Sequence, residues 1–388
     1  MTKNVIEFVD PVHGTKGYLA YRGAVRRLAA GGCRVRSGID ARTLSTLADR
    51  MAVKQRVLGL NVAGAKSGLD LDPSSPDKDA ILRRFFAFLR DELATRYSMG
   101  PDMGTAWAEL NRHAAAVGLS SIKYAIKTAQ RLDADQFAHR MAVLEAPVDG
   151  LPVSARRAGH ALAYAGIGAA KAARCTGPLT VALQGFGNLA RGAACALYEY
   201  GARVVAIGDE HGTVATPAGL DVPAMLGRPA GTPVPALPSG GRPAELFTVP
   251  ADLLILAGPA NAMSPAQAAR VAVPAVAVGA NCGLTERVER NLERRGVVVI
   301  PDFIGGIGGS ASMEALFGPR ECPAPRQVLD ALARLMRDLL ADLTEESRRE
   351  KVGTREAALR LASPGTADPD ALPYGGCPYL RDFVPTAR

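Results

Sequence analysis

The sequence predicts an α/β protein of two domains, the second of them built on an open parallel sheet. The chain has 388 residues, of which 48% are hydrophobic and 5% aromatic, and this length favours two cores over one. The stretch EAPVDGLPVS has the composition of a domain linker. After it, short apolar segments alternate with helical segments, which is typical of an open parallel sheet. We expect a first domain over 1–148, a second over 149–321, and terminal helices over 322–388.

Charge and cysteine spacing argue against several classes of function. The formal net charge is +8, but basic residues are interleaved with acids along the chain, so no nucleic-acid partner is expected. The six cysteines are far apart and the five histidines do not cluster with them, so neither disulfides nor a metal site is indicated. No apolar run reaches the roughly eighteen residues of a membrane helix, and no secretion signal is evident. We expect a cytoplasmic protein with no membrane partner.

The first domain begins with short strands over 4–21 and a turn at His13-Gly14. The paired glycines Gly31 and Gly32 follow, and would let a ligand approach the backbone. A helix is predicted over 41–58, with Asp40 as its N-cap and Leu44, Leu47, Met51 and Leu58 as its buried stripe. Lys54 falls on this stripe, where it either snorkels to the domain edge or faces an anion.

Two further charged residues stand in glycine-rich segments of the first domain. Only nine of the 46 basic residues are lysines, and lysine, unlike arginine, can give up its proton. Lys66 in VAGAKSGL is expected on a loop at the end of a strand. After a helix over 81–97, Asp102 occupies the turn MGPDMGT, and further helices are expected over 105–145. Taken alone, Asp102 is more simply explained as a turn or cap residue.

The second domain contains a dinucleotide-binding unit. A helix over 157–174 precedes the strand LTVALQ, which runs into the turn GFGNLA, a helix of small residues, and a second strand that ends in Asp209. In such a Rossmann unit the first glycine makes the turn and the second lets the pyrophosphate approach the helix N-terminus. The predicted contacts in the turn are Gly185, Phe186, Gly187, Asn188, Leu189 and Ala190.

Further strands are expected at ADLLILAG, AVAVGAN and VVVIPDF. The carboxyl ends of parallel strands form the ligand-binding edge of such a sheet, so Asn261 and Asn281 either contact the cofactor or serve as turn amides. In the terminal helical region Val328, Leu332, Leu335, Leu339 and Leu343 form one apolar stripe. Residues from Ser363 onward are expected to form an irregular tail.

In their order along the chain, these segments resemble the Glu/Leu/Phe/Val dehydrogenase family from Gly31 to Leu316. The resemblance rests on several short motifs, which are GGCR, MAVK, GAKSG, PDMGT, QGFGNLA, GAN and IPDFIGGIGG. It implies an amino-terminal α/β catalytic domain, completed by the helices of 322–388, and a Rossmann domain across a cleft. Members of the family usually form homo-oligomers.

The resemblance also implies a role for individual residues. Lys66 is similar to the catalytic lysine, Asp102 to its acidic partner, and Lys54 to the lysine that binds the substrate α-carboxylate. The implied reaction is the oxidative deamination of an amino acid to its 2-oxo acid and ammonia, or the reverse. The implied substrate-binding residues are Gly31, Gly32, Met51, Lys54, Ser310 and Met313.

Family members specific for glutamate carry a lysine directly before the paired glycines, where this chain has Ala30. The leucine, phenylalanine and valine type is therefore favoured, with an apolar substrate. Asp209 favours NAD over NADP, because a carboxylate accepts from the ribose 2′-hydroxyl and repels a 2′-phosphate.

The chain departs from the family pattern at two places, where Gly306 replaces an asparagine and residues 156–159 lack a threonine. Two other hypotheses follow from these departures. The first is the same chemistry on an unusual amino acid or 2-oxo acid in a biosynthetic pathway. The second is a non-catalytic nucleotide-binding homologue.

Overall fold

The computed structural model describes residues 5–24, 26–229, 231–234, 243–362, 368 and 370–381. Within these ranges the chain forms two compact α/β units, as the sequence predicts. Unit 1 is drawn from residues 1–141, 317–322 and 362–381, and unit 2 from residues 142–316 and 323–361.

Unit 1 is built on a five-stranded mixed sheet with the strand order β1-β2-β4-β3-β5. Strand β2 is antiparallel to β1 and to β4, whereas β3 is parallel to β4 and to β5. Every residue of β3 and β4 is buried. The strands are β1 (Val5–Val9), β2 (Lys16–Arg22), β3 (Leu28–Val35), β4 (Val62–Leu69) and β5 (Tyr97–Pro101).

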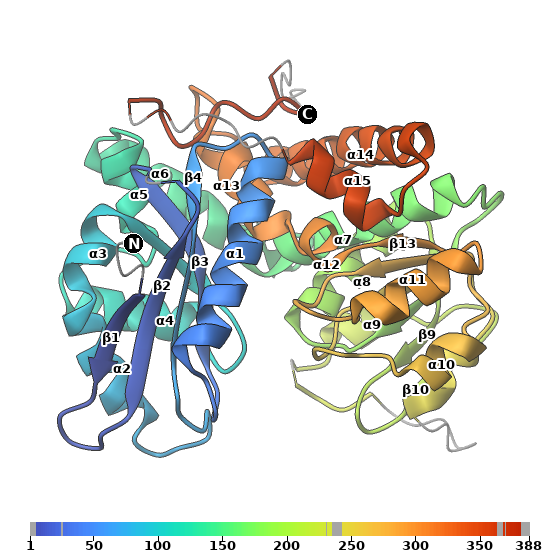
Figure 1. The fold of residues 1–388 in the computed structure, drawn as a ribbon, viewed down its shortest axis with the longest axis horizontal. Helices are drawn as coiled ribbons and strands as arrows, with labels where there is room; N and C mark the ends of the chain where they lie inside the picture. The colour runs from blue at the N-terminus through green and yellow to red at the C-terminus, as the bar shows by residue number, and fades with distance from the viewer. Residues whose placement is uncertain are drawn as a thin grey trace. The chain divides into compact units, whose positions relative to one another are not determined.

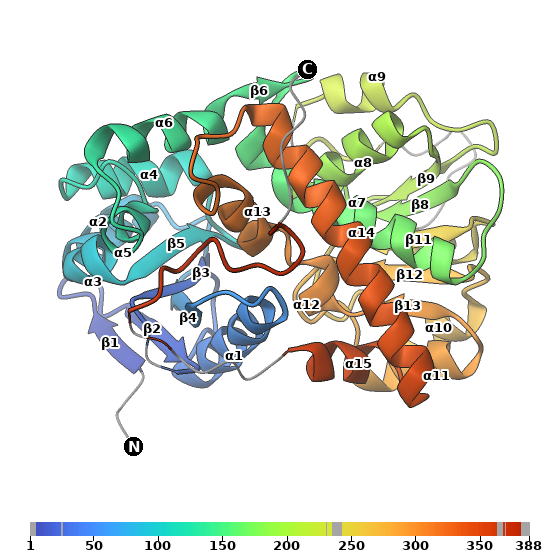
Figure 2. The ribbon, with the colours of Figure 1, turned by 90° about the horizontal axis from the view of Figure 1, so that it is seen from above.

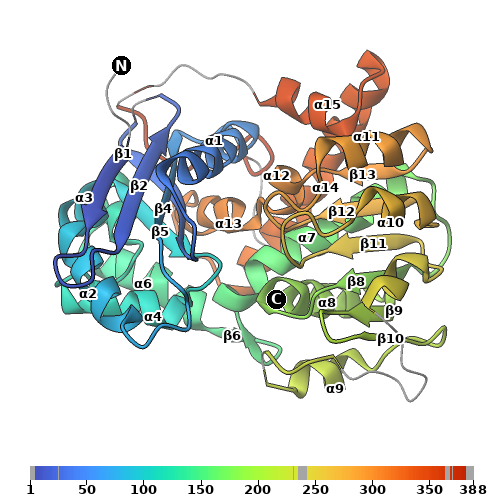
Figure 3. The ribbon, with the colours of Figure 1, turned by 60° about the horizontal axis from the view of Figure 1, so that its bottom comes forward.

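Helices cover both faces of this sheet (Figure 1, Figure 3). Helix α1 (Ala41–Val57) lies on one face and begins at the predicted N-cap, because the Asp40 carboxylate accepts a 2.7 Å hydrogen bond from the Thr43 N–H. The opposite face packs an apolar core against the helices α2 (Lys78–Phe88), α3 (Arg90–Thr95), α4 (Trp107–Ala116) and α5 (Tyr124–Ala129). Helix α6 (Ala134–Glu145) follows them along the chain.

Unit 2 contains the predicted open parallel sheet, with the order β10-β9-β8-β11-β12-β13. Five strands are parallel, and the unpredicted edge strand β10 is antiparallel to β9. The strands are β8 (Thr180–Gln184), β9 (Arg203–Gly208), β10 (Thr213–Ala215), β11 (Leu253–Leu256), β12 (Ala275–Val278) and β13 (Val298–Ile300). The segment predicted as the linker contains a small hairpin of β6 (Pro147–Val148) and β7 (Leu151–Pro152).

The helices of unit 2 include a close crossing of α7 (Val153–Ala172) and α8 (Asn188–Tyr200). A Cβ atom on Gly159 would lie 2.3 Å from the Leu189 carbonyl oxygen, so only glycine fits at this crossing. The other elements are α9 (Val222–Gly227), η1 (Pro243–Thr248), α10 (Pro265–Arg270), α11 (Glu286–Arg294), α12 (Asp302–Gly305), α13 (Gly308–Phe317), α14 (Pro325–Glu350) and α15 (Thr354–Leu361).

The terminal helices pack differently from the expectation that 322–388 accompanies the first domain. Helix α14 packs along α7, and both α14 and α15 belong to unit 2 (Figure 2). The physical reason is the apolar stripe of α14, which is fully buried. A Cβ atom on Gly168 of α7 would lie 2.8 Å from Leu340 Cγ, so the two helices are in close contact.

The end of the chain returns to unit 1. Residues 370–381 contain no helix or strand, as expected, yet Tyr374 is buried. The Tyr374 N–H donates to Gln130 Oε1 over 3.1 Å, and Gln130 Nε2 donates to the Tyr374 carbonyl over 3.2 Å. The other residues of the predicted tail, 363–367, 369 and 382–388, lie outside the described part of the chain.

Candidate active site

Lys66 lies within β4 and not on a loop, so this part of the sequence prediction was wrong. It is opposite Ala20 of β2 in the sheet register, and its side chain is only 3% exposed. The flanking glycine Gly64 is required by packing, because a Cβ atom there would lie 2.2 Å from the Ala48 carbonyl oxygen of α1. The small residues that suggested a loop instead allow α1 to approach the strand closely.

Asp102 follows β5, and one of its carboxylate oxygens contacts the Lys66 ammonium. The turn holds this carboxylate in place. Asp102 Oδ1 accepts from the Met103 N–H over 2.8 Å, and the Asp102 N–H donates to Thr105 Oγ1 over 3.0 Å. The turn therefore orients a side chain that is 11% exposed and already paired with Lys66.

Arg34 completes this cluster, and its role was not predicted. Its Nε lies 3.1 Å from Asp102 Oδ2 and its Nη2 lies 3.3 Å from Oδ1, so the guanidinium donates a hydrogen bond to each oxygen. Burial raises the pKa of Asp102, but attraction to Lys66 and Arg34 outweighs it and lowers the pKa to about 2. The aspartate is therefore a carboxylate at neutral pH.

The paired glycines make room for this cluster. A Cβ atom on Gly32 would lie 3.0 Å from Asp102 Cβ and 3.1 Å from Lys66 Nζ, and one on Gly31 would lie 1.6 Å from the Ala65 carbonyl oxygen. Residues two apart on a strand share a face, so Gly32 and Arg34 lie on the same face of β3. That alternation is the pattern from which Arg34 could have been predicted.

Other lysines of unit 1 are buried as well. Lys54 of α1 is 4% exposed, and Met51, one turn earlier, is half-buried. Lys123, which no sequence pattern singled out, is also buried and donates to Ser98 Oγ over 3.3 Å. A Cβ atom on Gly100 would lie 3.6 Å from Lys123 Nζ, which places this ammonium beside the strand that leads to Asp102.

The glycine turn of unit 2 fits a dinucleotide. Gly185 has φ +85°, which favours glycine, and Gly187 is the N-cap of α8. A Cβ atom on Gly187 would meet nothing within 4 Å, so the space over the helix N-terminus is open to a phosphate. Asn188 is exposed and Leu189 half-buried, whereas Phe186 and Ala190 are buried.

Asp209 directly follows β9, where the ribose-binding acid was expected. Its Oδ1 accepts from the N–H groups of His211 and Gly212 over 2.8 and 3.1 Å, and its Oδ2 accepts from the Val234 N–H over 2.6 Å. The carboxylate therefore organises its own loop and is held at a fixed position at the end of the strand.

Two other loops at the carboxyl edge of this sheet carry the predicted amides. Asn261 follows β11, is exposed and has φ +52°, and Asn281 follows β12 and is half-buried. The Asn261 N–H donates to the Cys282 carbonyl over 2.9 Å, so the two loops are directly connected.

Ser310 and Met313 lie on α13 and are 8% and 2% exposed. The start of this helix is held by Arg157, which stands in the segment where a threonine was expected. Arg157 Nη1 donates to Ser312 Oγ over 2.9 Å and lies 3.3 Å from the Gly309 carbonyl oxygen. The two departures from the family pattern, at 156–159 and at Gly306, thus concern neighbouring parts of unit 2.

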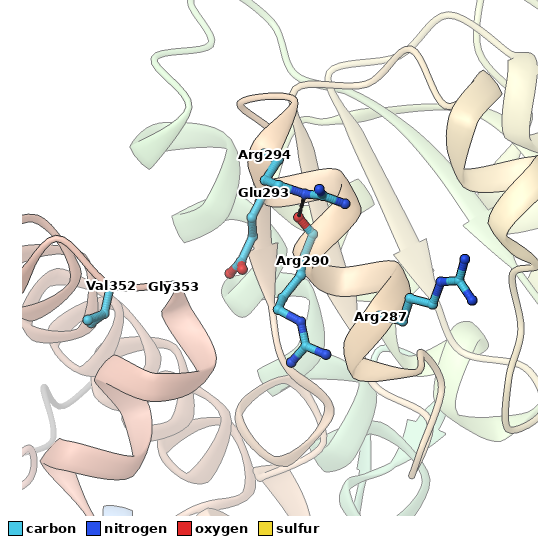
Figure 4. A pocket seen from close by; sticks show the side chains of 6 residues that line it. All are labelled: Arg287, Arg290, Glu293, Arg294, Val352 and Gly353. Carbon is cyan, nitrogen blue, oxygen red and sulfur yellow. Dashed lines mark hydrogen bonds between the residues drawn. The ribbon is translucent and has the colours of Figure 1, made fainter.

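A shallow depression of about 590 Å³ lies elsewhere on unit 2, between α11 and the turn from α14 to α15. Figure 4 shows Arg287, Arg290 and Arg294 along α11, with Arg294 Nε donating to the Arg290 carbonyl. None of the predicted site residues, all of which are described, lines this depression. It is therefore separate from the candidate site.

The described ranges contain neither a metal cluster nor a membrane helix. No group of three or more His, Cys, Asp and Glu side chains there is arranged to hold a metal ion. No helix in the same ranges combines the length and apolarity needed to cross a membrane.

The sequence is similar to that of known amino-acid dehydrogenases. Residues 150–368 match the profile of the family described as Glutamate/Leucine/Phenylalanine/Valine dehydrogenase, and residues 3–116 match the Glu/Leu/Phe/Val dehydrogenase dimerisation domain. Glutamate dehydrogenase B of Halobacterium salinarum is 32% identical over 76% of this chain and 67% of the relative. Glutamate dehydrogenase of Thermotoga maritima is 29% identical, over 89% of this chain and 83% of the relative.

Solved structures share the fold. The hetero-hexameric glutamate dehydrogenase of Thermus thermophilus, in a leucine-bound form, has a TM-score of 0.72 at 23% identity. The alignment covers 92% of this chain and 86% of the Thermus thermophilus chain. The L-tryptophan dehydrogenase of Nostoc punctiforme has a TM-score of 0.59 at 17% identity. The alignment covers 92% of this chain and 93% of the tryptophan dehydrogenase chain. These similarities support the fold and do not select a substrate.

Proposed function

The chain belongs to the Glu/Leu/Phe/Val dehydrogenase family and is an amino-acid dehydrogenase that uses NAD or NADP, and we propose that it oxidatively deaminates an L-amino acid with an apolar side chain, or runs the reverse reaction. The observation that carries the proposed chemistry is the buried cluster of Lys66, Asp102 and Arg34. It holds a base that can take a proton from water and a carboxylate that can exchange a proton with an amine.

The bound nicotinamide supplies a hydride acceptor for the substrate Cα hydrogen. In our proposal Asp102 first accepts a proton from the substrate ammonium group, because only the neutral amine can release hydride. The low pKa of Asp102 keeps it ionised at neutral pH. Its contacts to Arg34 and to the Met103 N–H fix the direction in which it presents its oxygens.

Loss of hydride leaves an iminium carbon that water attacks. In its neutral form Lys66 takes a proton from that water as general base, and the product is a carbinolamine. Asp102 returns its proton to the amine nitrogen, and the regenerated carboxylate takes the hydroxyl proton as the C–N bond breaks, so that ammonia leaves and the 2-oxo acid forms. One proton then stands on Lys66 and one on Asp102, side chains in direct contact, and both are released to ammonia and water.

The substrate α-carboxylate is the proposed partner of Lys54. The family resemblance gives this role to Lys54, which is 4% exposed on the helix that packs against β4. Held at its carboxylate, the amino acid would be oriented with its Cα hydrogen toward the cofactor. We propose that Met51, Gly31 and Gly32 border the same substrate, and that Ser310 and Met313 are further substrate-binding residues.

The preference for an apolar side chain rests on Ala30. Alternation along β3 places Ala30 on the same face as Gly32 and Arg34, which is the face that carries Lys66 and Asp102. Ala30 is buried and brings no charge to that face. A glutamate side chain would therefore lose its hydration without gaining a cation at this position.

For the cofactor we propose contacts from Gly185, Phe186, Gly187, Asn188, Leu189 and Ala190, and from Asn261 and Asn281. NAD is proposed over NADP because Asp209 presents a fixed carboxylate where the adenosine ribose is expected. We further propose a homo-oligomer, which the matched dimerisation domain supports. A reducing, cytoplasmic location is proposed as well, since all six cysteines are free thiols.

The proposal is tested by incubating the purified protein with leucine, valine, phenylalanine, tryptophan or glutamate and with NAD or NADP. We expect reduced nicotinamide and ammonia to appear in equal amounts, fastest with an apolar amino acid and NAD. A rate highest on glutamate would overturn the proposed substrate. No rate on any of these amino acids with either cofactor would overturn the proposal and favour an unusual substrate.

A further inference from the structure

The two loops that carry Asn261 and Asn281 share an unusual backbone. Asn261 has φ +52° and Cys282 has φ +57°, a conformation that residues with a Cβ atom rarely adopt. The loops are joined by two hydrogen bonds, from the Asn261 N–H to the Cys282 carbonyl over 2.9 Å and from the Ala262 N–H to the Gly283 carbonyl over 2.7 Å. Something in the surrounding structure must hold this conformation.

Asp302 supplies that support. It stands at the start of α12, is 1% exposed, and its Oδ2 accepts a 2.7 Å hydrogen bond from the Cys282 N–H. The bond fixes the same residue whose backbone is left-handed and whose carbonyl holds the Asn261 loop. A charged acceptor makes such a bond stronger than a neutral one.

Arg355 of α15 in turn pairs with Asp302. Its Nη2 lies 3.0 Å from Asp302 Oδ1, and its Nε and Nη2 lie 2.6 and 2.7 Å from the two oxygens of Glu289 on α11. The guanidinium also lies 5.2 Å from the centre of the Phe303 ring. All of these residues belong to unit 2. Arg355 of α15 is thus linked through Asp302 to the loops that carry Asn261 and Asn281.

We propose that Arg355 is a positioning residue for the cofactor, acting through Asp302 and the Cys282 backbone on the loops of Asn261 and Asn281. The inference rests on the proposed function in one respect, which is that these loops contact the dinucleotide. Arg355 holds the Asp302 carboxylate in the direction of the Cys282 N–H. The preformed loops then need no rearrangement when the cofactor binds.

A purely structural clamp between α11, α12 and α15 would explain the same contacts. The two explanations differ in what they predict for binding. A clamp affects stability alone, whereas a positioning residue also changes the dissociation constant of the cofactor.

The test compares Arg355→Met with Glu289→Gln. Glu289→Gln disrupts the other ion pair of Arg355 but leaves the contact with Asp302 in place, so it controls for damage to the α11–α15 packing. The measurements are the dissociation constant of reduced nicotinamide cofactor by fluorescence titration and the melting temperature. We expect Arg355→Met to raise the dissociation constant about tenfold and Glu289→Gln to change it less than about twofold.

A double variant checks the route of the effect. Glycine adopts positive φ readily, so Cys282→Gly should reduce the dependence of the loop on Asp302 and Arg355. We expect Arg355→Met/Cys282→Gly to bind the cofactor within about threefold of Cys282→Gly alone. An Arg355→Met protein that binds as the wild type does, or a tenfold loss that persists in the Cys282→Gly background, would overturn the inference. A wild-type protein that binds neither reduced cofactor would instead contradict the assignment of the cofactor itself.

Discussion

At the scale of single residues, the candidate site is defined by three titratable side chains buried in one unit. The Asp102 carboxylate contacts both Lys66 and Arg34, so two basic side chains share one acid. Removing ionised groups from water has a high cost in free energy, and groups with perturbed pKa values, such as Asp102, cluster at functional sites.

Replacing Lys66 tests the proposed base directly. Lys66→Met keeps an apolar stem of similar length but removes the amine, so we expect kcat to fall by about 10²- to 10⁴-fold, the usual contribution of a general base. Fluorescence titration should show unchanged cofactor affinity. Lys16→Met, at an exposed position of β2, is the matched control and should keep full activity. Activity retained by Lys66→Met would exclude the base role.

The pKa of Asp102 predicts how stability depends on pH. Because its pKa is lowered from 3.8 to about 2 in the folded protein, the carboxylate stabilises the fold above pH 3.8 by about 2 kcal/mol. This contribution is lost as the pH falls through the folded pKa. Urea unfolding of the wild type and Asp102→Asn should therefore give a difference in unfolding free energy that shrinks between about pH 5 and pH 2. A difference that is constant over this range would contradict the assignment.

At the scale of elements, local patterns predicted some features and missed others. The N-cap of α1 and the turn into α8 were predictable because each depends on a few adjacent residues. Lys66 was misplaced because glycines in VAGAKSGL indicate a loop locally, whereas here they admit a neighbouring helix. The partners Arg34–Asp102 and Arg355–Asp302 were missed because they join residues 68 and 53 positions apart.

Gly187, the N-cap of α8, and Gly159, within α7, should respond differently to alanine. At Gly187 the new methyl group meets nothing within 4 Å, so we expect stability to change by less than about 0.5 kcal/mol but the cofactor dissociation constant to rise about tenfold. At Gly159 it would lie 2.3 Å from backbone atoms of α8, and we expect a loss of about 1–3 kcal/mol. Unchanged cofactor affinity in Gly187→Ala would argue against a phosphate at this turn.

The packing of α14 is tested by shortening one leucine of its stripe. Leu339 is fully buried, so Leu339→Ala should lower the free energy of unfolding by about 2–5 kcal/mol. Leu359→Ala on α15 is the matched control, because Leu359 is 47% exposed and its loss should cost less than about 0.5 kcal/mol. Equal urea midpoints for the two variants would contradict the described packing.

At the scale of the whole molecule, the order of segments along the chain does not follow the division into units. Residues 317–322 and 362–381 belong to unit 1, while the helices between them belong to unit 2. The sequence predicted two α/β units and the stripe of α14, but not that the stripe would pack on α7. An apolar stripe shows that a helix needs a partner and does not identify it.

The substrate preference is a property of the molecule as a whole, and its central determinant is proposed to be Ala30. The most direct measurement is kcat/KM for leucine and for glutamate, on the wild type and on Ala30→Lys in parallel. We predict that the wild type favours leucine at least about tenfold and that the added lysine shifts the ratio toward glutamate. A wild type that favours glutamate, with a ratio that Ala30→Lys leaves unchanged, would contradict this assignment.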